Sequence, residues 1–273
     1  MRTAIVTPRA AALERLIALV LDTLPSVESK RAYRQALRDF FHWCEIEGAG
    51  GFTKANVNAY RASLEARLLS PSTINQRLSA IRKLAMEAAD NGFMPPDVAS
   101  AISRVKGAKR HGIRTGQWLT REQAERLISA PNVATVKGKR DRALLAVLVG
   151  CGLRRKEATA LAVEHIQLRD ARWVIVDLIG KGGRVRTVPM PSWAKNAIDA
   201  WITAAGIDSG LIFRSINKRG LVTGNSMTAR SIFDVVKMFG LRIGVPNVAP
   251  HDLRRTFAKL AHKGRARHWS KSN

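Results

Sequence analysis

The chain has 273 residues, of which 46% are hydrophobic, so it is long enough for two domains that each bury a core. Lysine and arginine number 46 against 21 acidic residues, which leaves a formal net charge of +25. The basic residues are spread along the whole chain, and this indicates a nucleic acid as partner, although charge alone does not separate DNA from RNA. The two cysteines, Cys44 and Cys151, lie in apolar surroundings, which argues against a disulfide framework and for a reducing compartment.

The beginning of the chain argues against a membrane-spanning protein, and the placement of its histidines argues against a metal-binding protein. An apolar run at 16–21 is interrupted on both sides by Glu14, Arg15 and Asp22, so it is too short to span a membrane. It predicts an amphipathic helix in a cytoplasmic protein that has no membrane contact. The six histidines are scattered and neither cysteine has a second one nearby, so we expect no metal site.

The amino-terminal part has the pattern of a helical bundle. Apolar residues recur at spacings of three and four over 29–47, Thr53 caps a short helix, and Ser70 with Pro71 begins a third that ends near Gly92. With the first amphipathic helix, four helices are expected over residues 10–102. Basic side chains with few acidic counterparts are predicted to point outward and face nucleic acid: Arg77, Arg82 and Lys83.

The segment 103–118 has a different composition. It holds six Lys, Arg or His residues and three glycines without an apolar period. We expect an interdomain linker that lies across a DNA backbone, with Lys106, Lys109 and Arg110 as its contacts.

The stretch 150–161, GCGLRRKEATAL, predicts a place that holds an anion. A capping box at Thr120 and Gln123 opens one helix, and a nearly all-apolar, buried helix that starts at Asp141 leads into the stretch. Gly152 allows a tight turn, a new helix N-terminus offers unpaired N–H groups, and Arg154 adds a planar donor fork suited to phosphate oxygens. Taken alone, the stretch also fits an ordinary turn with a surface ion pair to Glu157.

Two later stretches carry further basic residues. Alternating residues at 173–180 and 184–190 predict an antiparallel hairpin with Lys181 in its turn, where Arg184 and Arg186 would contact phosphates. Amphipathic helices at 193–205 and 226–240 are scaffold. Beyond them, His251 and Arg254 lie one turn apart on the same side of another helix.

Together, GCGLRRKEATAL at 150–161, GKGGRVRTVP at 180–189 and HDLRRT at 251–256 resemble, in this order, the core of the tyrosine recombinase and phage integrase family. The resemblance implies a mainly α fold with a small antiparallel β-hairpin or sheet. It implies a helical core-binding (SAM-like) domain at 10–102 and a catalytic domain at 119–264 that is incomplete at its C-terminal side. Residues 265–273 would then be an aberrant tail.

The resemblance also implies a reaction. Members of the family bind double-stranded DNA and cleave and rejoin its strands by transesterification, for integration or excision, and no metal or nucleotide cofactor is expected. Arg154 and Arg254 would hold the non-bridging phosphate oxygens, His251 would share proton transfer, and Lys181 would protonate the leaving 5′ oxygen. Intact members work as tetramers on paired DNA sites.

One part of the family pattern is missing from this sequence. The family has a Leu-Gly-His box after the His-x-x-Arg helix and then a nucleophilic tyrosine, whereas the only tyrosines here are Tyr33 and Tyr60, which are expected in the first core. His268 and Trp269 are not the box, because no Leu-Gly precedes them and no helix pattern surrounds them. A frameshift, a truncation and a natural short paralogue are all open. The chain is expected to be an inactive recombinase, a non-catalytic regulator that occupies recombination sites, or a degenerate gene product.

Overall fold

The structure is a computed structural model, and it describes residues 10–109, 118–180 and 183–269. The chain divides into two compact units, Met1–Arg114 and Thr115–Asn273. Each unit has a hydrophobic core of its own.

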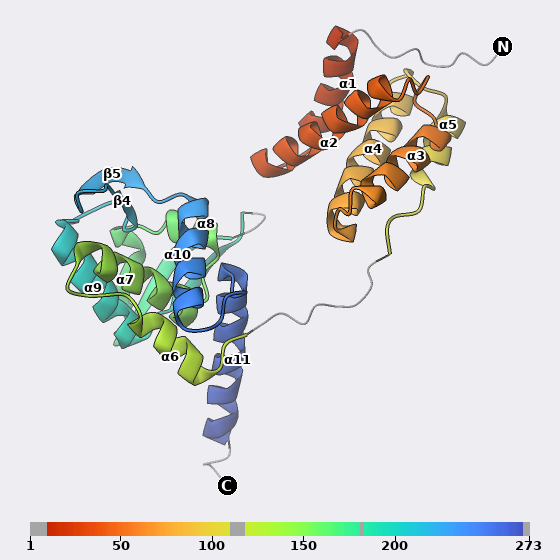
Figure 1. Cartoon of the computed structure of the whole chain (residues 1–273). Helices are drawn as coiled ribbons and strands as arrows, with labels where there is room; N and C mark the ends of the chain where they lie inside the picture. Colours follow the sequence, from red (N-terminus) through yellow and green to blue (C-terminus); the bar gives the residue numbers. More distant parts are fainter. Residues whose placement is uncertain (1–9, 110–117, 181–182, 270–273) are drawn as a thin grey trace. The chain divides into compact units, whose positions relative to one another are not determined.

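The described residues of the first unit form a bundle of five helices (Figure 1). Serine and threonine residues fix three of the helix starts, because the side chains of Ser26, Thr53 and Ser70 accept the backbone N–H three residues further on. The sequence predicted four helices, and the fifth was missed because it has only eight residues and begins at the second of two consecutive prolines. The helices are α1 Ala10–Asp22, α2 Val27–Ile46, α3 Lys54–Ala66, α4 Pro71–Asp90 and α5 Pro96–Ser103.

The core of the first unit forms where the apolar faces of these helices meet. Phe40 of α2 lies at its centre, with ring centroids 5.1 Å from Tyr60 and 5.2 Å from Phe41. Tyr60 is fully buried and Tyr33 is half-buried against the core, as the sequence predicted for both tyrosines. Val105 is also buried, so the first residues of the segment predicted as a linker pack against this unit.

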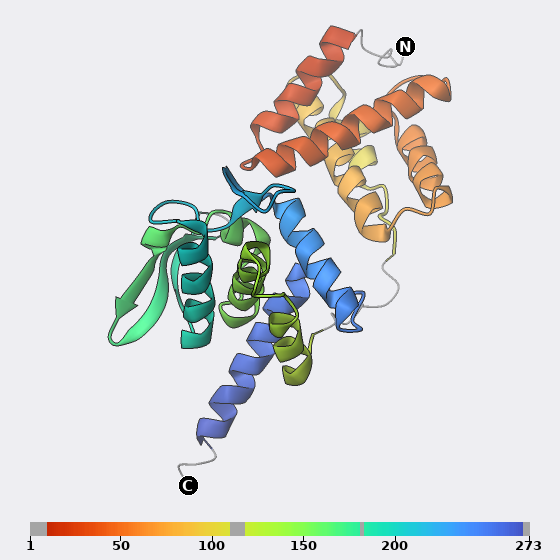
Figure 2. The same cartoon turned by 60° about the vertical axis from the view of Figure 1, so that its left-hand side comes forward.

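The second unit is mainly helical with two small antiparallel sheets (Figure 2). Its helices are α6 Arg121–Ser129, α7 Val136–Gly150, α8 Arg155–Thr159, the 3-10 turn η1 Val163–His165, α9 Ser192–Ala205, α10 Ala229–Arg242 and α11 Pro250–Trp269. Its strands are β1 Ile166–Arg169, β2 Arg172–Ile179, β3 Val185–Pro189, β4 Arg214–Ile216 and β5 Val222–Ser226.

Helix α7 forms the centre of the second unit, since every residue from Ala143 to Gly150 is buried. The predicted start at Asp141 is wrong. Thr135 caps the helix by accepting the Gly138 N–H, and Asp141 lies one turn inside it as a buried partner of Arg140. The capping box at Thr120 and Gln123 is present as predicted.

The larger sheet has the order β1-β2-β3, and β2 and β3 form the predicted hairpin. Its register shifts between Ile175 and Leu178, where Asp177 has a φ of 53°. This bulge keeps Val176 and Leu178 buried and places Leu178 opposite Arg186. Lys195 of α9 lies 4.0 Å from the ring centroid of Trp173 in β2, so helix and sheet pack side by side.

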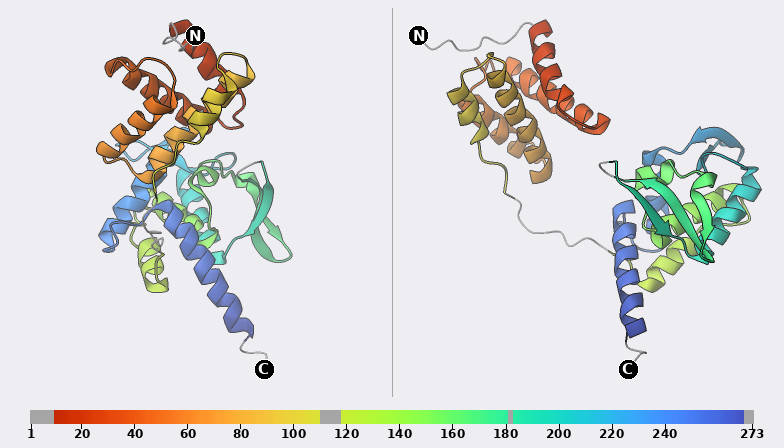
Figure 3. Two further views of the ribbon diagram at one scale, coloured as in Figure 1. Left: turned by 90° about the vertical axis from the view of Figure 1, so that its right-hand side faces the viewer. Right: turned by 180° about the vertical axis from the view of Figure 1, so that it is seen from behind.

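Helix α11 packs against α7 with its first turns and then projects beyond the other elements of the second unit (Figures 1 and 3). It continues to Trp269, so the expectation of no helix around His268 and Trp269 is wrong. Among the described residues, no helix is both long and apolar enough to cross a membrane.

Candidate active site

The first side of the site is the turn between α7 and α8. Gly152 has a φ of 62°, and Arg154 is the N-cap residue directly before α8. The sequence predicted unpaired N–H groups at this helix start. In the structure the Arg154 N–H is occupied, because it donates to Glu157 Oε2 at 2.8 Å. The side chains of Arg154, Arg186 and Arg254 add guanidinium donors around this turn.

Glu157 joins two of those side chains. Its carboxylate accepts from Arg154 Nη1 at 2.8 Å and from Arg186 Nη2, on β3, at 2.7 Å, and its side chain is 4% exposed. Burial acts to raise the pKa of Glu157, but the bonds from Arg186 and from the Arg154 backbone and side chain outweigh it and lower that pKa. The carboxylate is charged at neutral pH and holds both guanidiniums in place.

The other side of the site is the beginning of α11. Arg254 is half-buried and its Nη1 donates to the carbonyl of Gly152, so the second arginine is fixed to the turn that bears the first. Its pKa is lowered by burial and then by the positive charge of Arg154, although a guanidinium stays protonated. His251 is exposed on the first turn of the same helix. A side chain at Gly152 would overlap the Phe257 ring, so α11 packs closely on the turn.

These contacts bring three guanidiniums, Arg154, Arg186 and Arg254, around one carboxylate. A Cβ at Gly180 would lie 2.8 Å from Arg186 Nη1 and 3.8 Å from Arg154 Nη1, so the residue directly after β2 lies next to the same cluster. Three positive groups against one negative group leave an excess of positive charge, and 45% of the Arg154 side chain is exposed to solvent. The arrangement suits a phosphate with two non-bridging oxygens.

The structure brings together Arg154, Arg186 and Arg254 of the predicted site residues, while Lys181 and Arg110 lie outside the described residues. Arg186 was expected to touch phosphates, and it is held by Glu157. The i, i+3 spacing of Arg154 and Glu157 was visible in the sequence, but the bond from Arg186 depends on the hairpin register. Arg184, the residue directly before β3, is exposed.

The predicted DNA-facing residues of α4 do not point freely outward. Arg77 is half-buried and bonds Asp39 and the Tyr60 hydroxyl, Arg82 donates to the Val105 carbonyl, and Lys83 pairs with Glu87 at 3.1 Å. The expectation of outward side chains is therefore wrong for Arg77 and Arg82, and their contact with DNA stays a prediction. Lys106 and Lys109 are exposed, as a DNA contact requires.

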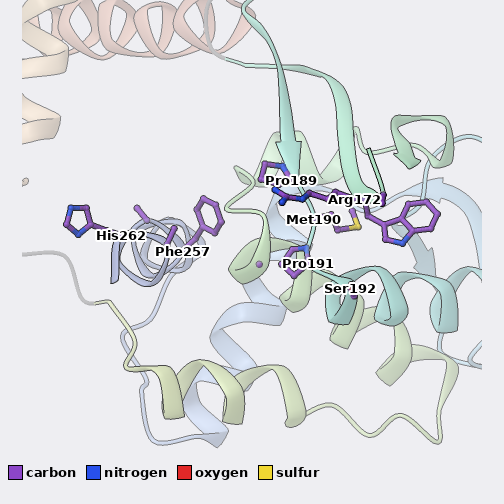
Figure 4. A pocket seen from close by; sticks show the side chains of 12 residues that line it. Arg172, Pro189, Met190, Pro191, Ser192, Phe257 and His262 are labelled. Carbon is purple, nitrogen blue, oxygen red and sulfur yellow. The ribbon is translucent and has the colours of Figure 1, made fainter. Parts of the chain in front are cut away.

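A groove of about 810 Å³ lies along α11, next to the site. Figure 4 shows Phe257 pointing from α11 toward Pro189, Met190 and Pro191, whereas His262 points away from them. Ala258 and Ala261 line the same groove and are exposed. One apolar side of α11 is thus uncovered in the described part of the chain.

Within the ranges that the structure describes, no group of three or more His, Cys, Asp or Glu side chains could hold a metal ion. Among the described residues, Arg154, Arg186 and Arg254 supply positive charge to the site.

Comparisons with known proteins agree with this architecture. Residues 117–265 match the phage integrase family, and residues 16–92 match the phage integrase N-terminal SAM-like domain. The tyrosine recombinase XerC of Xanthomonas campestris is 30% identical over 253 residues, which cover 91% of this chain and 74% of the relative. XerD of Shewanella oneidensis is 30% identical over 236 residues, with 83% and 74% covered.

Solved structures show the same fold. The XerH site-specific recombinase bound to a palindromic difH substrate matches with a TM-score of 0.68 at 17% identity, over 94% of this chain and 75% of that one. The Tn1549 transposon integrase in complex with circular intermediate DNA matches with a TM-score of 0.65 at 17% identity, over 92% of this chain and 87% of that one. Since a family model covers more than half of the sequence and relatives match both units, the chain belongs to the phage integrase family of tyrosine recombinases.

Proposed function

We propose that the chain binds duplex DNA with both units and engages a backbone phosphate in the cluster of Arg154, Arg186 and Arg254. The observation that carries this proposal is the fixed geometry of the cluster, in which Glu157 orients two guanidiniums and the Gly152 carbonyl orients the third. Groups that are already in place stabilise charge on a phosphate without first reorganising. The net charge of +25 agrees with a polyanionic partner.

The chemistry that this site serves is transesterification at phosphorus. Negative charge builds on the non-bridging oxygens as a hydroxyl attacks, and Arg154 and Arg254 neutralise it. The 5′ oxygen that leaves needs a proton, and Lys181 is the residue we assign to that step, with His251 sharing proton transfer. The bond to the attacking oxygen forms as the bond to the 5′ oxygen breaks, so the energy of the phosphodiester is conserved.

The attacking hydroxyl is the part that these 273 residues do not supply. Tyr60 is buried, its hydroxyl donates to Asp39 Oδ2 at 2.7 Å, and burial together with the Asp39 carboxylate raises its pKa. Tyr33 packs against the same core. We therefore propose that the 273-residue chain binds DNA but forms no covalent bond to it.

Binding is tested by filter binding of a labelled duplex across a salt series. The proposal expects affinity to fall steeply as salt rises, because each phosphate neutralised by Lys or Arg adds about 0.9 to the slope of log K against log salt. A flat response, or equal binding of an acidic peptide, would overturn it. Covalent chemistry is tested by incubation with nicked duplexes and denaturing electrophoresis, where no protein-linked DNA is expected.

A second candidate function is occupation of recombination sites without cleavage. The observation in its favour is that hydrogen bonds hold the arginine cluster in place, while both tyrosines of these 273 residues pack in the first core. Mixed with an active recombinase on shared DNA sites, such a regulator reduces strand exchange in proportion to its occupancy. Unchanged strand exchange at saturating chain would exclude this role.

A further inference from the structure

The four residues 105–108, which we call the strap, lie against the first unit. They follow α5 in the sequence. Val105 is 2% exposed and Ala108 packs against the core of the unit. Three carbonyls of the strap accept side-chain donors: Val105 from Arg82, Lys106 from Arg61 Nη1 at 3.1 Å, and Ala108 from Asn75 Nδ2 at 3.0 Å. The backbone of this segment is thus bonded to α3 and α4.

Asn75 holds the strap in both directions. Besides donating to the Ala108 carbonyl, it accepts the Ala108 N–H on its Oδ1 at 2.8 Å. Gly107 lies directly against this amide, because a side chain there would overlap Asn75 Oδ1. An amide that satisfies both backbone groups of one residue fixes the position and the direction of the chain at that point.

Two lysines carry positive charge here, Lys106 within the strap and Lys109 directly after it. Lys106 and Lys109 are exposed, and they line a groove of about 530 Å³ together with Arg61. One carboxylate, Glu65, also lines the groove, and it is bonded to Arg61. The groove therefore presents more positive than negative charge, and Lys106 and Lys109 lie within and directly after a backbone segment that hydrogen bonds hold against α3 and α4.

We propose that Asn75 is a positioning residue for DNA binding, which holds the strap so that Lys106 and Lys109 contact phosphates from a fixed backbone. The inference rests on the proposed function. Ordering a segment during binding weakens affinity, and a segment that is ordered beforehand avoids this loss. Asn75 itself does not need to touch DNA.

The test is a double-mutant cycle in the full chain. In the first arm, Asn75→Ala weakens duplex binding by about threefold to tenfold and lowers the salt slope by up to about 1.8, the contribution of two phosphate contacts. In the second arm, Asn75→Ala is added to a Lys106→Ala, Lys109→Ala background. There it has little further effect, because the side chains that it positions are already gone.

Asn56→Ala is the matched control. Asn56 also holds a loop of the same unit by two side-chain bonds to backbone carbonyls, those of Gly50 and Gly51, but that loop carries no basic residue. We expect this variant to bind DNA like the wild type. Hydrogen exchange of the Ala108 amide reports directly on the clamp, and the amide is protected in the wild type and exchanges faster in Asn75→Ala.

The outcomes separate the inference from the proposed function. A wild-type chain without salt-dependent binding overturns the function. A wild-type chain that binds, with an Asn75→Ala variant that releases the Ala108 amide yet keeps its affinity, overturns the inference, as does an undiminished effect in the double-lysine background. If Asn75→Ala fails to fold, Gly107→Ala carries the same test, because it disrupts the clamp without changing α4.

Discussion

Replacement of Glu157 by glutamine tests how the arginine cluster is held together. The carboxylate accepts three hydrogen bonds, two from guanidiniums and one from the Arg154 backbone, and it is the negative group between Arg154, Arg186 and Arg254. A glutamine of the same shape has one acceptor oxygen, and its amide group donates toward the same donors. Glu157→Gln is therefore expected to destabilise the second unit and to loosen both guanidiniums.

The size of the effect follows from burial. Removing one partner of a buried ion pair costs about 3–5 kcal/mol, because the other charge is left unpaired. Here the side chains of Arg154 and Arg186 are 45% and 30% exposed, so water compensates part of the loss. The glutamine oxygen also keeps one hydrogen bond, and we expect a decrease of about 2 kcal/mol in the free energy of unfolding.

The pH dependence of this difference has a definite sign. The folded pKa of Glu157 is lowered, so the stabilisation is fully present above the unfolded pKa of a glutamate, about 4.3, and is lost as pH falls through the folded value. The wild type and Glu157→Gln should therefore differ by a constant amount at neutral pH. Below about pH 4 the difference should shrink.

Denaturant unfolding followed by tryptophan fluorescence measures the effect, because five of the six tryptophans lie in the second unit. Glu125→Gln is the control, since Glu125 forms an exposed pair with Arg121 and should change stability little. Equal stability of Glu157→Gln and wild type at neutral pH, or a difference that grows in acid, would refute the assigned role of the carboxylate.

Three further predictions concern other parts of the chain. Gly152→Ala should lower the free energy of unfolding by about 1–3 kcal/mol, because a side chain is strained at a φ of 62° and overlaps Phe257. Gly183→Ala is the control that measures the backbone strain alone, because Gly183 has a φ of 74° and open space around it. Equal losses of stability in the two variants would contradict the overlap with Phe257. Neither cysteine should react with a thiol reagent in the folded chain at about pH 8, because burial raises the pKa of Cys44 to about 11 and that of Cys151 to about 12. Fast labelling before denaturation would show that the labelled thiol is not buried. The apolar groove along α11 should bind a hydrophobic dye and reduce solubility, and a highly soluble chain that binds no dye would count against an uncovered face.

Elements with local signals could be predicted from the sequence. Thr53, Ser70 and Thr120 begin helices where expected, because a cap depends on residues within one turn. The start of α7 was placed too late, since the polar turn before Asp141, with Gly138 inside it, hides the cap at Thr135. Strands β4 and β5, of three and five residues, are too short to give a period.

The candidate site was predictable in part. The glycine turn, Arg154 and the His251–Arg254 spacing are features of short sequence motifs. The motifs and their order along the chain were therefore sufficient to predict these residues. The bond between Arg186 and Glu157 could not be predicted from the sequence. It depends on the bulge at Asp177, which shifts the hairpin register, and on the packing of β3 against α8. The same limit applies to Arg77, whose bonds to Asp39 and Tyr60 join three helices.

The measurement that tests the central claim most directly is the salt dependence of duplex binding by an Arg154→Ala, Arg254→Ala double variant. Arg169→Ala is the control, since Arg169 is an exposed arginine of β1 bonded to Gln167. If the cluster holds a DNA phosphate, the double variant binds more weakly and its slope of log K against log salt is smaller than that of the wild type by about 0.9, while the control keeps the wild-type slope. A folded double variant with the affinity and slope of the wild type would contradict a phosphate site at Arg154 and Arg254.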